Sequence, residues 1–248
     1  MRIERLEFVS AFEKDETILL TAGREIKRLQ TELESAVIQL NVPGGAPPEL
    51  PRIVIQAKGF VLNICQNRFQ FLLSPPDHIS GSYAETREYL SEIVRPRLKS
   101  LFLCGVDYLW SGLIQTVNFP ADLEQAPTAM DAVTPAIRQL VRLDWPAETL
   151  ASFSLKVGRS NEGFYHTFQV SGYATRLLEI EVSPGQNTIE VGPDQGSLEE
   201  TGIQVVVDVN NRPSSGTGDP LGDFDGVGAE HMKTFEEMPR VLGLTEII

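Results

Sequence analysis

Hydrophobic positions along the chain follow two spacings, and the change from one to the other marks the predicted elements. Leu6, Phe8 and Phe12 occupy even positions near the N-terminus and predict a half-buried strand over residues 3–12. Between residues 18 and 40, apolar side chains recur every three or four positions, which predicts a helix. The proline- and glycine-rich segment 43–51 that follows predicts a loop.

A second helix is predicted after a β-meander. Three β-rich runs, residues 52–57, 60–65 and 68–73, are separated by two-residue turns and predict that meander. Ser82 and Glu85 then have the spacing of a capping box, so we expect a helix to begin there and to continue to Phe102. Pro96 lacks an amide hydrogen and is expected to kink or split this helix.

The second part of the chain repeats this alternation. It predicts strands at residues 106–119, 151–157, 164–170, 175–182 and 203–209, with a helix within 129–143. Gly172 is expected to form the turn between the strands at 164–170 and 175–182. Residues 210–228 are rich in Gly, Ser, Pro and Asp and predict a mobile loop, after which residues 230–238 predict a short helix.

These elements predict an α+β fold with a mostly antiparallel sheet and helices packed on one face, because hairpin-length turns join consecutive strands. The order strand, helix, three strands, helix occurs in residues 3–103 and again from residue 106 onward. We therefore expect a single domain over residues 1–248. Two similar halves, 1–104 and 105–248, are the alternative.

Charge and composition exclude some classes of protein. The 34 acidic and 21 basic side chains give a net charge of −13, which disfavours broad binding to nucleic acid. Residues 177–248 contribute −11 of this charge, with 14 acidic and 3 basic side chains. No apolar run resembles a secretion signal or is long enough to cross a bilayer, so we expect a cytoplasmic protein with no membrane partner. Cys65 and Cys104 lie in apolar runs, where reduced thiols are expected and one bridge between them is the alternative.

The acidic C-terminal third supplies the candidate binding residues. Asp219, Asp223, Asp225 and Glu230 could meet a basic partner, or could gather oxygen ligands around a hard cation. The calcium-loop spacing fails, since Leu221 and Met232 would fall at ligand positions, and metal binding stays open. His231, close to these carboxylates, is the best single titratable candidate, although a histidine at this point is more often exposed at a helix start.

No catalytic or cofactor motif can be assembled from the remaining residues. The segment 216–222 lacks the spacing of a dinucleotide-binding loop, no histidine pair has zinc spacing, and no nucleophile elbow is present. We expect no cofactor, and a non-catalytic protein is favoured over an enzyme. Arg95, Arg97 and Lys99 could face an acidic partner, with ordinary surface pairing as the stronger interpretation.

Three segments together resemble one family: residues 68–71 (Arg-Phe-Gln-Phe), 116–120 (Thr-Val-Asn-Phe-Pro) and 205–209 (Val-Val-Val-Asp-Val). It is the sporadically distributed family of uncharacterised bacterial proteins found near mobile elements and defence genes. The chain departs from the family at residues 111–118, where an Arg-Tyr-Ile-Asn strand is usual, and the family supplies no catalytic residues. The absence of a catalytic motif and the acidic C-terminal third favour a non-catalytic protein-interaction module of a cytoplasmic complex, with another protein or a second copy of this chain as partner. The resemblance implies an association with bacterial defence or mobile elements. A metal-dependent enzyme that uses the acidic C-terminal residues is the alternative.

Overall fold

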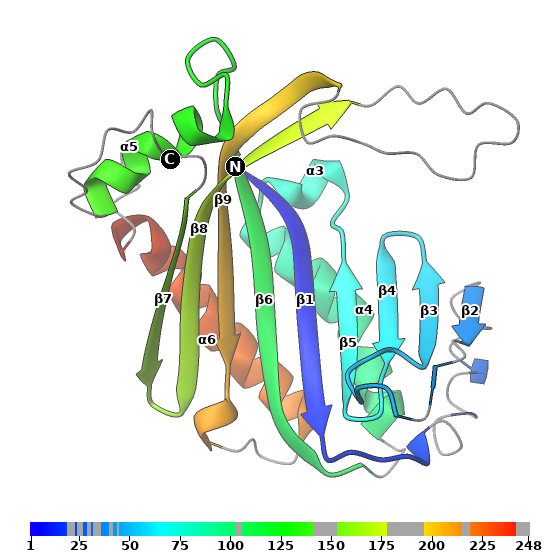
Figure 1. Ribbon diagram of the computed structural model, residues 1–248. Coiled ribbons are helices and arrows are strands. Elements are labelled where there is room, and N and C mark those ends of the chain that lie inside the picture. The colour runs from blue at the N-terminus through cyan, green and yellow to red at the C-terminus, as the bar shows by residue number, and fades with distance from the viewer. Residues whose placement is uncertain are drawn as a thin grey trace, which may run out of the picture.

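The protein is built on one nine-stranded antiparallel sheet, seen in the computed structural model of Figure 1. The structure describes residues 1–18, 23, 27–28, 31, 36–39, 42–43, 45–102, 106–140, 153–177, 196–214 and 219–241. The strands are β1 (Arg2–Phe12), β2 (Ala36–Gln39), β3 (Ile53–Ala57), β4 (Phe60–Ile64), β5 (Arg68–Leu73), β6 (Tyr108–Pro120), β7 (Ser154–Asn161), β8 (Phe164–Leu177) and β9 (Ser197–Asn210). The helices are α3 (Asp77–Ser80), α4 (Tyr83–Phe102), α5 (Ala129–Leu140), the 3-10 turn η2 (Arg212–Ser214) and α6 (Pro220–Val241).

The strand order is β2-β3-β4-β5-β1-β6-β9-β8-β7, so the first strands of the two halves, β1 and β6, lie next to each other in the middle. Every strand pair in the described part of the chain is antiparallel, for example Phe8 opposite Leu113 between β1 and β6. Helices α4 and α6 both lie behind the sheet in the view of Figure 1. The predicted α+β class, with an antiparallel sheet and helices on one face, is therefore confirmed. The repeat of two halves, and the choice between one domain and two, stay predictions.

The hydrophobic core lies between this covered face of the sheet and the helices. Phe8, Leu113 and Val209 are neighbours by register on β1, β6 and β9, and all three side chains are buried. Leu90 of α4 and Phe224 of α6 pack onto them, and the Phe224 ring meets the Phe8 ring edge-on at a centroid distance of 4.8 Å. Alternation along the strands thus gives the sheet its buried face, as expected for period-two patterning.

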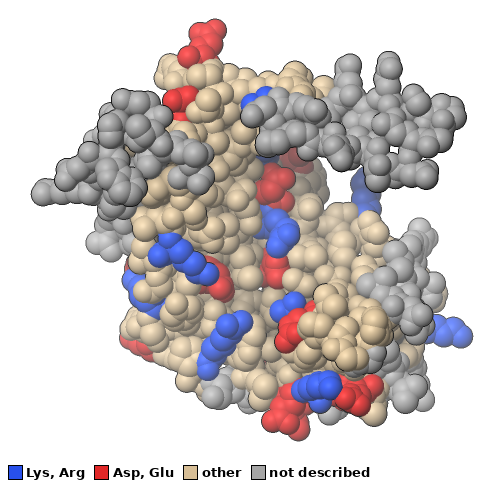
Figure 2. All heavy atoms as spheres, in the orientation of Figure 1, with Lys and Arg blue, Asp and Glu red and all other residues tan. Residues whose placement is uncertain are grey.

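The opposite, uncovered face of the sheet carries polar side chains that bond to one another. Arg5 and Gln70 each donate a hydrogen bond of 2.6 Å to the carboxylate of Glu7, and Asn63 donates to Gln70 at 3.0 Å. Figure 2 shows this face, with acidic and basic side chains next to each other along its middle. A polar face of this kind is typical of an antiparallel sheet that faces solvent on one side.

Several predicted elements are confirmed with small shifts. The β-meander is found at β3, β4 and β5, and Ser82 accepts a hydrogen bond from the Glu85 amide at the start of α4, 3.4 Å away. Strands β7 and β8 are joined by a turn with positive φ angles at Glu162 and Gly163. Helix α4 continues through Pro96 for all its 20 residues, so Pro96 does not split the helix, and the alternative of a kink stays a prediction.

Three predictions about element boundaries are wrong, each because of a contact distant in sequence. The helix expected up to residue 40 gives way to strand β2, whose residues Ala36–Gln39 pair with β3. Gly172 is not a turn: β8 runs straight through it, and a Cβ there would stand 2.3 Å from the Ala129 carbonyl oxygen, so glycine is what lets α5 begin against β8. Residues 220–228, expected in a loop, begin helix α6.

Two further observations bear on earlier expectations. Cys65 is buried with a free thiol, and burial raises its pKa, whereas Cys104 lies outside the described residues, so a bridge between them is untested. In the part of the chain that the structure describes, no helix combines the length and the apolar character needed to cross a membrane.

Candidate functional site

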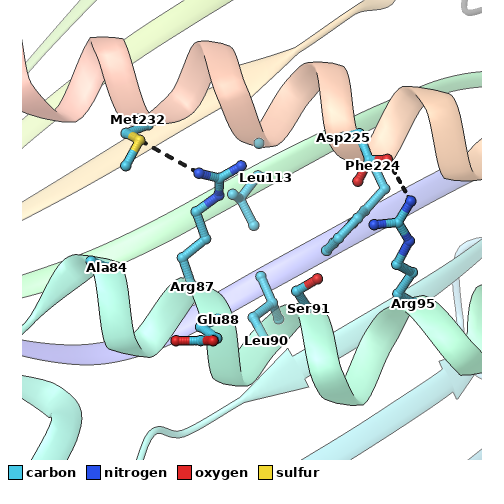
Figure 3. Close-up of a pocket in the computed structure, with 11 residues that line it drawn as sticks. Ala84, Arg87, Glu88, Leu90, Ser91, Arg95, Leu113, Phe224, Asp225 and Met232 are labelled. Atoms are coloured by element: carbon cyan, nitrogen blue, oxygen red, sulfur yellow. Dashed lines mark hydrogen bonds and ion pairs between the residues drawn. The ribbon is translucent and has the colours of Figure 1, made fainter.

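Helices α4 and α6 lie side by side on the covered face and enclose a pocket that opens to solvent between them (Figure 3). Its volume is about 370 Å³, within the range of small-ligand sites. We call it the interhelical pocket. Its lining residues are Ala84, Arg87, Glu88, Leu90, Ser91, Arg95, Leu113, Phe224, Asp225, Gly228 and Met232.

The floor of the interhelical pocket is the outer surface of the hydrophobic core. Leu90 from α4, Leu113 from β6 and Phe224 from α6 are each almost fully buried and converge there (Figure 3). Because the ring of Phe224 rests edge-on against Phe8, its position is fixed by the core beneath it. The pocket therefore presents a preformed apolar floor to a bound group.

Two arginines of α4 project from the same wall of the pocket. Arg95 forms a 2.8 Å ion pair with Asp225 of α6, and both side chains are about half exposed. Arg87 donates a hydrogen bond from Nη1 to the sulfur of Met232, 3.4 Å away, and its guanidinium lies over Gly228. Within the described residues, no carboxylate lies at ion-pair distance from Arg87. A thioether is a weak acceptor, so this contact uses little of the hydrogen-bonding capacity of the guanidinium.

A buried tyrosine–histidine pair joins the two helices next to the pocket, one residue before the lining residues Ala84 and Met232. Tyr83 Oη and His231 Nδ1 are 2.7 Å apart, and His231 Nε2 lies 3.4 Å from the carbonyl oxygen of Val207. A carbonyl can only accept, so Nε2 carries the proton and Tyr83 donates to Nδ1. Burial lowers the pKa of His231 to about 3 and raises that of Tyr83, with the charge of Arg87 lowering both. Both groups are therefore neutral at pH 7.

A second buried histidine joins β8 to α6. His166 Nδ1 lies 2.9 Å from Thr234 Oγ1, and Thr234 donates its own hydrogen to the Glu230 carbonyl at 2.8 Å. The imidazole must therefore be the donor to Thr234. Its Nε2 stands 3.7 Å from the Glu230 carboxylate, but burial still lowers the pKa of His166, assisted by Arg159. This group holds the helix on the sheet in its uncharged form.

The four carboxylates predicted as binding residues lie at the start of α6 and along it, and each has different contacts. Asp219 accepts a hydrogen bond from the Leu221 amide at 3.0 Å and caps the helix start. Asp223 is only 3% exposed, whereas Asp225 stands at the pocket rim with Arg95. Glu230 lies between His166 and Lys233, 3.1 Å from the lysine ammonium. Their role in binding a partner stays a prediction.

The metal alternative needs these carboxylates to converge, and helix α6 separates them instead. Among the described residues, no group of three or more His, Cys, Asp or Glu side chains could hold a metal ion. His231 also differs from expectation, because it is fully buried in the middle of α6 and bonded to Tyr83 rather than exposed at a helix start.

Neither Arg87 nor the pocket itself was predicted from the sequence. Arg87, Ser91 and Arg95 follow one another at four-residue spacing, a signal for one helix face that could have been used. The opposite wall could not be found in this way, because it comes from a segment predicted as a loop. Arg97, predicted with Arg95 as a partner-facing cluster, instead donates to the Ile93 carbonyl and lies over the ring of Phe60, 5.4 Å from its centroid.

A search of known families and of curated proteins gives no relative for this chain. No protein-family model matches it, and no curated protein matches it.

Proposed function

We propose that this protein is a non-catalytic protein-interaction module that docks a partner protein at the interhelical pocket. The observation that supports this most directly is the form of the pocket, in which a preformed apolar floor lies below a rim of charged side chains from two helices. Protein interfaces are commonly organised this way, with an anchoring side chain that fills a desolvated pocket and a polar rim around it.

The size of the pocket suits one anchoring group. A volume of about 370 Å³ accommodates a large side chain with part of its backbone. The Arg95–Asp225 ion pair stays half exposed at the rim, where it can exchange its partners with those of an incoming chain at low cost. The partner would therefore be held mainly by the anchoring side chain that packs on the apolar floor.

The setting of this module is part of the same proposal. The resemblance to sporadically distributed bacterial proteins supports a role in a cytoplasmic complex associated with defence genes or mobile elements. The partner is another protein or a second copy of this chain, and the net charge of −13 disfavours nucleic acid.

Filling the pocket tests this proposal. Tagged protein is purified at low salt from a lysate of its own host, and stoichiometric companions are identified by mass spectrometry. Ser91→Trp places an indole in the pocket mouth, whereas Glu92→Trp adds the same group at the next, exposed position of α4, which does not line the pocket. We expect a companion to co-purify with the wild type and with Glu92→Trp, and to be lost with Ser91→Trp.

Thermal unfolding of both tryptophan variants checks that each one folds. If the folded Ser91→Trp protein retains its companion, or if the wild type has no stoichiometric companion, the proposal is wrong.

A further inference from the structure

The two arginines of the interhelical pocket differ in a way that points to a ligand. Both belong to α4 and line the same pocket, eight positions apart. The charge of Arg95 is compensated by Asp225 at 2.8 Å, but Arg87 contacts Met232 through a sulfur atom. In the described ranges of the chain, Arg87 thus keeps its positive charge uncompensated beside an apolar floor.

The uncompensated charge of Arg87 is felt by the groups around it. It lowers the pKa of both Tyr83 and His231, and neither of these neutral groups offers it a negative charge. The Arg87 side chain is half-buried and extends across the pocket toward α6, where its guanidinium lies over Gly228 and bonds to Met232 through one nitrogen (Figure 3). A planar guanidinium in this position presents a fork of donors that matches an incoming oxyanion.

The surroundings favour a carboxylate over a phosphate. A carboxylate carries one charge and two oxygens, which a single guanidinium satisfies through two parallel hydrogen bonds. A phosphate dianion would need further donors, and Glu88 and Asp225 at the same pocket would repel its second charge. The acidic surface of the whole chain acts in the same direction.

The apolar floor next to Arg87 defines the rest of the ligand. Leu113 lies next to the guanidinium of Arg87 and Leu90 lies below it, whereas Phe224 lines the floor farther along, next to Arg95 (Figure 3). The carboxylate and the apolar group should therefore branch from nearly the same atom. The last residue of a polypeptide has this form, because its terminal carboxylate and its side chain share one Cα. A glutamate or aspartate side chain ends in its carboxylate and offers no apolar group beside it.

We propose that the interhelical pocket binds the C-terminal carboxylate of a partner chain whose last residue is apolar, with Arg87 as the anion receptor and Leu90, Leu113 and Phe224 as the side-chain site. This inference rests on the proposed docking function and specifies the group that docks. Arg87 is then a binding residue with no part in any covalent step.

Small probes test the inference directly on the full chain. N-acetyl-phenylalanine carries the carboxylate and the apolar group on one carbon, N-acetyl-phenylalaninamide lacks the charge, and N-acetyl-glutamic acid α-amide carries the carboxylate on its side chain. Binding is measured by calorimetry or by NMR titration. We expect N-acetyl-phenylalanine to bind with a dissociation constant on the order of 1 mM, and both other probes to bind at least about tenfold more weakly.

Two basic residues of α4 provide matched variants. Arg87→Gln should weaken binding of N-acetyl-phenylalanine by about tenfold or more, while Lys99→Gln, at an exposed position that does not line the pocket, should change it by less than about twofold. Inorganic phosphate should not displace the probe. The inference is overturned if N-acetyl-phenylalanine does not bind, if either weaker probe or phosphate competes equally well, or if folded Arg87→Gln binds as the wild type does.

Failure of this inference can be told apart from failure of the docking function. If Arg87→Gln still retains the companion protein that Ser91→Trp loses, docking at the pocket stands and recognition of a terminal carboxylate is wrong. If both variants lose the companion and the probe, both proposals are supported.

Discussion

The two faces of the sheet satisfy their polar side chains in different ways. On the covered face, polar groups bond across elements: Tyr83 with His231 between two helices, His166 with Thr234 between a strand and a helix, and Ser10 with Ser111 between β1 and β6. On the uncovered face, Glu7 accepts hydrogen bonds from Arg5 of the same strand and from Gln70 of the neighbouring strand.

This difference follows from access to water. A buried polar group that loses its partner pays the full cost of desolvation, so each pair on the covered face fixes how one element sits on another. On the uncovered face, water can replace the lost partner of a half-exposed donor such as Arg5, so its bond constrains the structure less, although Glu7 itself is buried. At the interhelical pocket, the covered face of the sheet comes close to solvent. The floor of the pocket is rigid because the core packs against it from below.

The largest expected effect is a difference in unfolding free energy between apolar substitutions on the two faces. Phe8→Ala should lower the free energy of unfolding by about 3–5 kcal/mol, because it removes a fully buried ring and the support of Phe224. Ile114→Ala, on the uncovered face and half-buried, should cost about 1 kcal/mol. Urea denaturation measures both values. Equal losses would mean that the uncovered face is buried in the protein as purified.

The pH dependence of stability should come from the covered face. His231 has a folded-state pKa of about 3 against an ordinary value of 6.5, so the unfolded chain binds a proton that the folded one does not. Its contribution is fully present above pH 6.5 and decreases as the pH falls, reaching a loss of about 2 kcal/mol at pH 5. Denaturation at pH 7.5, 6.5 and 5 measures this loss.

A variant isolates the histidine from the carboxylates, some of which act in the opposite direction: burial raises the pKa of Asp208. His231→Gln should remove most of the difference in stability between pH 7.5 and pH 5 that the wild type shows. An unchanged difference would show that His231 does not cause it.

Two tyrosines allow a matched comparison of single hydrogen bonds. Tyr83→Phe leaves the buried Nδ1 of His231 without its donor and should cost about 1–2 kcal/mol. Tyr173→Phe removes a 2.7 Å hydrogen bond to Glu200 on the uncovered face and should cost less than about 1 kcal/mol, since water can take its place. The unfolding free energies of the two variants test this, and the reverse order would contradict it.

The smallest effect is expected at the pocket rim. Asp225→Asn breaks the half-exposed ion pair with Arg95 and should change the free energy of unfolding by less than about 1 kcal/mol. The same denaturation experiment in low and high salt should show that even this small difference decreases as salt is added. A loss above about 2 kcal/mol would mean that the pair is structural rather than a replaceable rim contact.

Local patterns predicted the elements whose own residues decide their structure. The meander of β3, β4 and β5 was predicted because short turns and β-rich runs lie next to each other in sequence, and α4 because its cap and its apolar stripe are local. Period-two alternation also predicted a sheet with one buried face. These features need no contact from elsewhere in the chain.

Distant contacts decided the rest. Residues 36–39 continue the helical spacing of apolar positions, but they form a strand that pairs with β3. Glycine is common in turns, but Gly172 lies within a strand and lets α5 approach it closely. The Gly- and Asp-rich start of α6 has weak helical propensity, and burial of Phe224, Val227 and His231 against the sheet stabilises it as a helix. Propensity is worth a few tenths of a kcal/mol per residue, so packing overrides it.

The sequence by itself determined the α+β class, the antiparallel sheet, the buried face and the acidic balance of this protein, because each depends on composition or on spacing between near neighbours. Only the tertiary structure decided that Arg87 and Arg95, on one helix, meet different partners on another. A charge pair or an uncompensated charge between elements more than 100 residues apart is set by how those elements pack, and no local pattern encodes it.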